Sequence, residues 1–193
     1  MAGYTAISDS GRTIVEFLRR NCVPPVEKPE FIGMCSPDEP GNFRLGVCLY
    51  DISEDAGTSV NRGEIVVDET HVRAAPSAVN LHYMIFTAPK SDISVRAQDE
   101  QRILGRVFQT LSDNRVISDR LYGSLAEAGQ ALNINLENIA YEDKLKIWAA
   151  YSVSPKPALF YKASAVFIDS EKIREVRRVT TADITLRQRG TRR

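Results

Sequence analysis

Apolar residues along this chain follow two different spacings. Over residues 4–21 and 95–112 they recur every three or four positions, which predicts two amphipathic helices. A shorter helix is predicted over residues 142–150, which carry Leu145 and Trp148. The apolar stripe of the second helix consists of Ile103, Leu104, Val107, Phe108 and Leu111. We expect this stripe to be buried, so Phe108→Ala should destabilise the fold by about 3–5 kcal/mol, as large-to-small core changes do.

Other segments have the composition of β-strands, and residues 43–52 show the period of two, with Phe43, Leu45, Val47 and Leu49 on one face. The main ones are residues 43–52, 79–87 and 158–168, with shorter strands predicted at 31–35 and 132–136. Both faces of 79–87 are apolar, which predicts a central position in the sheet, covered by helices on one side. Residues 176–187 are rich in β-branched side chains and are predicted to be extended, as a further strand of the same sheet.

The order of these elements predicts an α+β fold, because strands and helices do not alternate in repeated βαβ units. We predict one mixed domain over residues 1–173, with a central, mainly antiparallel sheet and helices packed on one face. Residues 174–193 are predicted to form a basic C-terminal arm, β-prone at first and then frayed. Residues 54–63 have turn-forming composition without an apolar period, which predicts an exposed, mobile hairpin tip.

Charge is balanced over the whole chain but not along it. The 193 residues contain 25 basic and 25 acidic side chains, so no global field attracts the protein to nucleic acid or to anionic lipid. Residues 174–193, however, contain seven arginines against two carboxylates, those of Glu175 and Asp183. No aromatic residues are interleaved with these arginines, so the arm lacks the stacking platforms of a nucleic-acid binder.

Two interpretations of the arginine-rich arm remain open. One is a solubilising, frayed tail over residues 188–193. The other is that residues 176–187 add a strand to a neighbouring sheet, where guanidinium groups meet carboxylates. In that case the candidate interface residues are Val179, Thr181, Ile184, Leu186, Arg187 and Arg189.

Side chains that could carry catalysis are sparse. The histidines are His71 and His82, and the second lies in an alternating strand, which is typical of a hydrogen-bonded or interface histidine. Ser124 lacks the flanking pattern of a nucleophile elbow and is expected to be a loop serine. We therefore expect no enzymatic activity, no cofactor and no metal. An unrecognised active site around Asp51, Asp68 and His71 is the alternative.

The cysteines and the N-terminus bear on the cellular compartment. Cys22, Cys35 and Cys48 are odd in number and form no C-x-x-C pair, which favours reduced, partly buried thiols over a disulfide framework. Asp9 and Arg12 interrupt any apolar N-terminal run, and no stretch approaches the ~20 residues needed to cross a bilayer. We expect assembly in the cytoplasm without a signal peptide and without a membrane span.

Four segments together resemble one family. They are the opening Met1-Ala-Gly-Tyr-Thr-Ala-Ile-Ser-Asp, the turn Ile32-Gly-Met-Cys-Ser-Pro-Asp, the strand Phe43-Arg-Leu-Gly-Val-Cys-Leu-Tyr-Asp-Ile and the helix Asp99-Glu-Gln-Arg-Ile-Leu-Gly-Arg. In this order they resemble the cap, or tail-terminator, proteins of contractile injection systems. The resemblance extends over nearly the whole chain, to about residue 184.

The resemblance implies a fold similar to phage tail-terminator subunits and a structural role. Such a subunit would form a ring, expected to be a hexamer, that terminates the inner tube and anchors the end of the sheath. Its partners would be further copies of itself, the inner tube protein and the sheath protein, with no nucleic acid. Its final location would be within an injection particle. The alternative is an assembly adaptor or chaperone-like binding module of another complex.

Overall fold

The computed structural model describes residues 3–55, 57, 63–88, 90, 92–118 and 123–175. In chain order its elements are α1 (Ala6–Asn21), the 3-10 turn η1 (Pro29–Phe31), β1 (Ile32–Met34), β2 (Leu45–Glu54), β3 (Glu64–Val66), β4 (His71–Ala74), β5 (Ser77–Thr87), α2 (Ile93–Asp113), β6 (Val116–Ile117), α3 (Gly123–Ala128), β7 (Leu132–Leu136), α4 (Tyr141–Ala150), β8 (Ala158–Ile168) and β9 (Ile173–Glu175). The predicted helices and the strands up to β8 are confirmed. The short elements β3, β4, β6, α3 and β9 were not predicted, since none is long enough to show a period.

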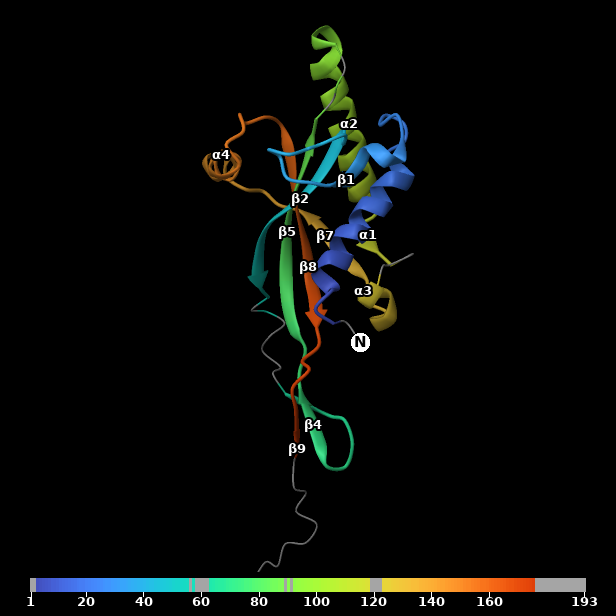
Figure 1. The fold of residues 1–193 in the computed structure, drawn as a ribbon, viewed down its shortest axis with the longest axis vertical. Coiled ribbons are helices and arrows are strands. Elements are labelled where there is room, and N and C mark those ends of the chain that lie inside the picture. Colours follow the sequence, from blue (N-terminus) through green and yellow to red (C-terminus); the bar gives the residue numbers. More distant parts are fainter. Residues whose placement is uncertain are drawn as a thin grey trace, which may run out of the picture.

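The main sheet has six strands in the order β1-β2-β5-β8-β7-β6. Only β1 and β2 are parallel, and every other pair is antiparallel, so the prediction of a mainly antiparallel sheet is confirmed. The two long strands β5 and β8, of eleven residues each, run side by side through its centre (Figure 1). The predicted strand over residues 176–187 lies outside the described residues.

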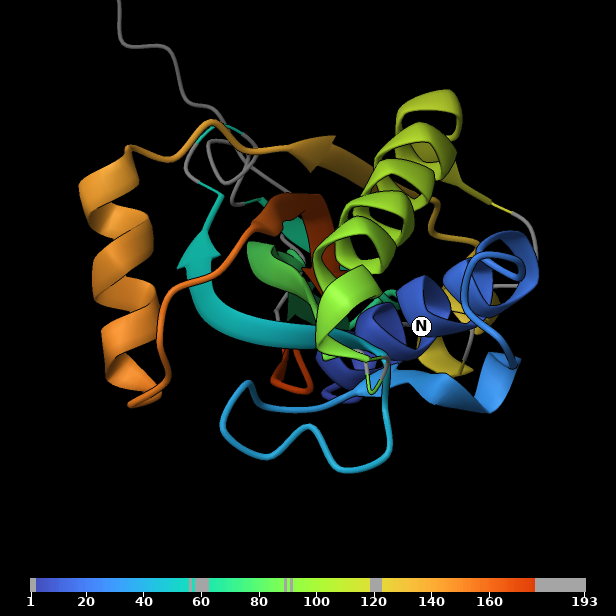
Figure 2. The ribbon, with the colours of Figure 1, turned by 90° about the horizontal axis from the view of Figure 1, so that it is seen from above.

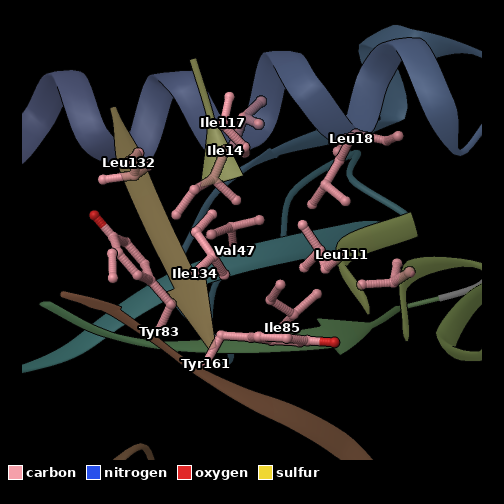
Figure 3. Close-up of a cluster of buried hydrophobic side chains, with 14 of the residues drawn as sticks. Ile14, Leu18, Val47, Tyr83, Ile85, Leu111, Ile117, Leu132, Ile134 and Tyr161 are labelled. Atoms are coloured by element: carbon pink, nitrogen blue, oxygen red, sulfur yellow. The ribbon is translucent and has the colours of Figure 1, made fainter. Parts of the chain in front are cut away.

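Helices α1, α2 and α3 cover one face of this sheet. In α1, Ile14 and Leu18 are spaced four residues apart, so both point from one side of the helix into the core. They pack against side chains of the central strands, among them Val47 and Ile85 (Figure 3). The helix ends at Asn21 shortly before Pro24, because a proline cannot donate the next helical hydrogen bond.

Phe108 is an exception to the predicted stripe of α2. Its stripe neighbours are buried, but the Phe108 side chain is 45% exposed. It lines a hollow beside β7, where β6 pairs with Leu132 and Asn133, the Ile134 N–H donates to Arg115 O at 2.7 Å, and no described strand pairs with Asn135 or Leu136 on that side. The expectation that Phe108 belongs to the core is therefore wrong, because no strand among the described residues covers it there.

The opposite face of the main sheet carries α4, as Figure 2 shows. Trp148 of α4 is buried in a second cluster with Cys48, Met84, Phe86 and Phe160. The rings of Trp148 and Phe86 meet edge to face with centroids 6.2 Å apart. The predicted arrangement with helices on one face is thus incomplete, because the apolar second face of the central strands needs a cover of its own.

A smaller sheet of three strands, in the order β3-β4-β9, lies beyond the end of the main sheet (Figure 1). An ion pair of 2.6 Å between Arg174 of β9 and Glu64 of β3 spans it. It exposes apolar side chains, including Val66 (71% exposed) and Ile173 (57%). The predicted boundary between residues 173 and 174 falls within β9, and the rest of the predicted arm lies outside the described residues.

Candidate assembly surface

Three side chains lie in the order serine, histidine, carboxylate, as in the catalytic triad of a serine hydrolase. Ser53 Oγ lies 2.8 Å from His82 Nε2, and His82 Nδ1 lies 2.9 Å from Glu137 Oε2. The Tyr50 hydroxyl donates to the same Glu137 oxygen at 3.2 Å. Burial, together with the nearby Glu137 carboxylate, raises the pKa of Tyr50. The spacing of these residues along the chain gave no signal of this group, because they come from three separate segments.

The backbone around Ser53 differs from the backbone around a serine nucleophile. A serine nucleophile is normally presented on a sharp turn, with backbone N–H groups free to bind the developing oxyanion. Ser53 instead lies within β2, opposite Asn80 of β5 in the sheet register. His82 thereby links β2 to the segment after β7, as a hydrogen-bonded histidine. This confirms the interpretation of His82 drawn from its place in a strand.

The second histidine closes a turn. Asp68 accepts hydrogen bonds from the backbone N–H groups of Thr70 and His71, both at 2.8 Å, and lies 2.9 Å from His71 Nδ1. The Thr70 N–H bond, followed by the His71 contact, lowers the pKa of Asp68 to about 2. Asp51 lies in the other sheet, opposite His82. The structure therefore does not group Asp51 with Asp68 and His71, and Asp68 acts as the turn's hydrogen-bond acceptor.

The cysteines and Ser124 are the remaining side chains that could act as nucleophiles. The three cysteines are free thiols, with Cys22 and Cys48 buried and Cys35 half-buried. Burial raises the pKa of Cys35 to about 11, so it is a poor nucleophile at neutral pH. Ser124 falls in α3, and not in the loop that was expected. Within the described ranges, no three His, Cys, Asp or Glu residues converge to hold a metal, and no helix is long and apolar enough to cross a membrane.

What the fold leaves open is a strand edge. β2 has ten residues, but β1 pairs with only the first three, Leu45–Val47. Among the described residues, no strand pairs with the outer side of β2 beyond that point. Ile52, in this uncovered part, is 47% exposed. A strand edge that has no described partner strand, here over residues 48–53, is a template for another strand.

An apolar groove lies beside this edge. It has a volume of about 550 Å³. Its lining comes from the start of α1, the end of β1, the middle of β2 and one residue of β5, namely Tyr4, Ile7, Ser8, Gly11, Met34, Cys35, Val47, Cys48, Leu49 and Tyr83. Tyr4, at its rim, is 83% exposed. We call this feature the α1–β2 groove.

Two residues shape the α1–β2 groove. A Cβ atom at Gly11 would come within 2.6 Å of the Met34 sulfur, so the glycine leaves room for the Met34 side chain against α1. The Tyr83 hydroxyl is buried and has no hydrogen-bond partner among the described residues. Such a group costs stability unless a polar group reaches it. The sequence signal for this groove was Gly11, a glycine in the middle of a predicted amphipathic helix.

The interface residues predicted from sequence lie elsewhere along the chain. Val179, Thr181, Ile184, Leu186, Arg187 and Arg189 are all outside the described residues, so they remain a prediction. β9 is the described element that leads into them, because it ends at Glu175.

Comparison with known proteins identifies a family. The sequence model of the Pvc16 N-terminal domain family matches residues 11–182. No curated protein matches the chain by sequence. Among solved structures, the sheath/tube terminator of PVC, an extracellular contractile injection system, in its extended state is similar, with a TM-score of 0.64 at 18% identity over 95% of this chain. The tube-terminating cap of the anti-feeding prophage has a TM-score of 0.61 at 20% identity over 91% of this chain.

These two structures are longer than this chain, which spans 64% and 59% of their lengths. At such low identity the likeness establishes the fold: a mixed α+β unit with a curled, mainly antiparallel sheet. The fold predicted from the resemblance to tail terminators is therefore confirmed.

Proposed function

The chain belongs to the Pvc16 N-terminal domain family, and we propose that it is a structural cap subunit of a contractile injection system. In this proposal it forms a ring, a hexamer, that terminates the inner tube and anchors the end of the sheath. The observation that carries the proposal is the likeness of the fold over 95% of the chain to a sheath/tube terminator. The likeness to a tube-terminating cap supports the same role.

The surface of the subunit is compatible with a closed ring. Rings arise from heterologous contacts, in which one patch of a subunit meets a different patch of the next. This subunit has two different unfinished surfaces, the open edge of β2 and the exposed small sheet with Val66 and Ile173. A subunit with such surfaces is completed by its neighbours. Residues 176–193, which follow β9, would then be an assembly arm.

A non-catalytic role fits the side-chain chemistry. His82 and Glu137 are hydrogen-bonded to each other, and Asp68 closes a turn. The thiols of Cys22 and Cys48 are buried, and the pKa of the Cys35 thiol is raised. The subunit would act by shape, as a component assembled in the cytoplasm and retained within the particle.

Particle assembly provides the test. The genes for the tube, sheath and baseplate proteins of the same particle are expressed with and without this chain, and the particles are measured by negative-stain electron microscopy. We expect six copies at one end of each particle, and uncontrolled tube length or detached sheath when the chain is absent. Particles of normal length with intact sheath in its absence would contradict the proposal. A chain that binds tube or sheath protein but is missing from finished particles would indicate the adaptor role instead.

A further inference from the structure

The uncovered part of β2 presents backbone hydrogen-bonding groups outward. The Asp55 N–H donates to Ala78 O of β5 at 2.9 Å, so Asp55 is turned toward β5. Orientation alternates along an antiparallel strand, so Ser53 is also turned inward while Ile52 is turned outward. The Ile52 N–H and C=O groups therefore face the open side. A strand laid along this side would extend the six-stranded sheet where β1 stops.

The α1–β2 groove would receive the side chains of such a strand on one face. Ile7, Leu49 and Met34 offer it apolar surface. Exposed carboxylates flank the site, with Asp38 and Glu39 on the loop after β1 and Asp51 on β2. The preferred occupant is thus an extended segment that is apolar on one face and is flanked by basic residues.

Residues 176–187 of this chain have that composition. With the period of a strand, Ala182, Ile184 and Leu186 fall on one face. Arg187 and Arg189 follow directly. Eighteen residues follow β9, which at ~3.3 Å each give a reach of about 60 Å. β9 itself lies beyond the end of the main sheet (Figure 1), so this reach starts away from the subunit's own groove.

We infer that residues 176–187 of one copy add as a strand to the open edge of β2 in the next copy, with Ile184 and Leu186 in the α1–β2 groove. This inference rests on the proposed function, because it requires neighbouring copies. Backbone hydrogen bonds to Ile52 supply affinity, and the groove selects the face of the strand. The arginines lie against Asp38 and Asp51, where exposed pairs contribute little affinity but favour one orientation.

Photo-crosslinking of the full chain tests the location directly. A benzophenone amino acid replaces Leu186 in one preparation and Thr185, on the opposite face, in a matched control. We expect irradiation to link position 186 to Ile7, Met34 or Leu49 of a second copy, giving covalent dimers and longer ladders, with a lower yield from position 185. Links within one copy, links only to tube or sheath protein, or a parent chain that stays monomeric at assembly concentration each overturn the inference.

Charge substitution tests the edge itself. Ile52→Lys places a charge on the open edge, and Val95→Lys on α2 is the control, since the two side chains are 47% and 45% exposed. Ile52→Lys should raise the concentration for half-assembly about tenfold or more, equal to deletion of residues 176–193, while melting stays unchanged. The two changes combined should add nothing further, because they remove the same contact. Assembly of Ile52→Lys at the parent concentration overturns the inference.

The same experiment separates the two proposals. If Ile52→Lys fails to assemble but still binds tube protein, the strand contact and the cap role both stand. If copies crosslink through position 186 but the chain binds neither tube nor sheath protein, the cap role fails and the strand contact stands.

Discussion

The two sheets of this molecule use apolar residues in opposite ways. Under α1, the main sheet buries Ile14, Leu18 and Ile85 almost completely. The small sheet leaves Val66 and Ile173 more than half exposed, although it is built from the same kinds of residue. Burial of apolar surface stabilises the first within one chain. The small sheet gains that stabilisation only when another surface covers it. The comparison therefore separates a sheet that is stabilised within one chain from a sheet that a partner would complete.

The largest effect should come from the core of the main sheet. Trp148→Ala removes a fully buried ring from the cluster under α4, so the free energy of unfolding should fall by about 3–5 kcal/mol. Urea denaturation followed by circular dichroism measures this loss. A loss below about 1 kcal/mol would mean that α4 is not packed on the sheet, and the second face would then resemble the small sheet.

A smaller loss in the free energy of unfolding is expected at the outer edge of the main sheet, beside β7. Phe108→Ala removes a half-exposed ring beside β7, so we expect a loss of about 1 kcal/mol in the same denaturation assay. Leu111→Ala, one turn away and buried, is the matched control and should lose about 2–5 kcal/mol. Equal losses from the two variants would show that the outer edge of β7 is covered in solution.

The small sheet should tolerate loss of its apolar residues. Val66→Thr keeps the β-branched shape and removes exposed apolar surface, so unfolding of the isolated chain should change by no more than about 0.5 kcal/mol. The chain's solubility should rise or stay unchanged. If this variant unfolds as easily as Trp148→Ala, then Val66 is buried within the isolated chain and the comparison of the two sheets is wrong.

The smallest effect concerns the turn of the small sheet and depends on pH. The pKa of Asp68 is lowered from 3.8 to about 2 in the folded chain, so its charged form stabilises the turn above the unfolded pKa. That contribution is lost as pH falls from about 4 to about 2. The parent should therefore lose its melting advantage over Asp68→Asn in this window. An advantage that is the same at pH 2 and pH 6 would contradict the hydrogen-bond assignment.

Sequence patterns predicted the long elements well and the short ones poorly. Residues 158–168 were placed with the observed bounds, because a long, mostly apolar run that follows Pro155 and Pro157 leaves little ambiguity. β6 has two residues, and no period can be read from two positions. Phe108 shows a second limit. A helical stripe predicts which side chains point toward the sheet but not where the sheet ends.

The assembly surface depends on information that no local pattern holds. The α1–β2 groove arises because Gly11 and Met34, 23 positions apart, meet across α1 and β1. The open edge arises because β1 is seven residues shorter than β2. The resemblance to tail terminators gave the fold and the role to propose, while the interface residues from 179 to 189 remain a prediction.

The short length of β1 limits how many strands a neighbouring copy can add to β2. Because β1 occupies the edge of β2 as far as Val47, an incoming strand meets the end of β1 near Cys35 and cannot slide further along the sheet. In the proposed contact, each copy therefore receives one strand and donates one arm. A chain of units with one donor and one acceptor each cannot branch. It either grows as a filament or closes on itself, and the rotation between neighbours decides how many units complete the circle.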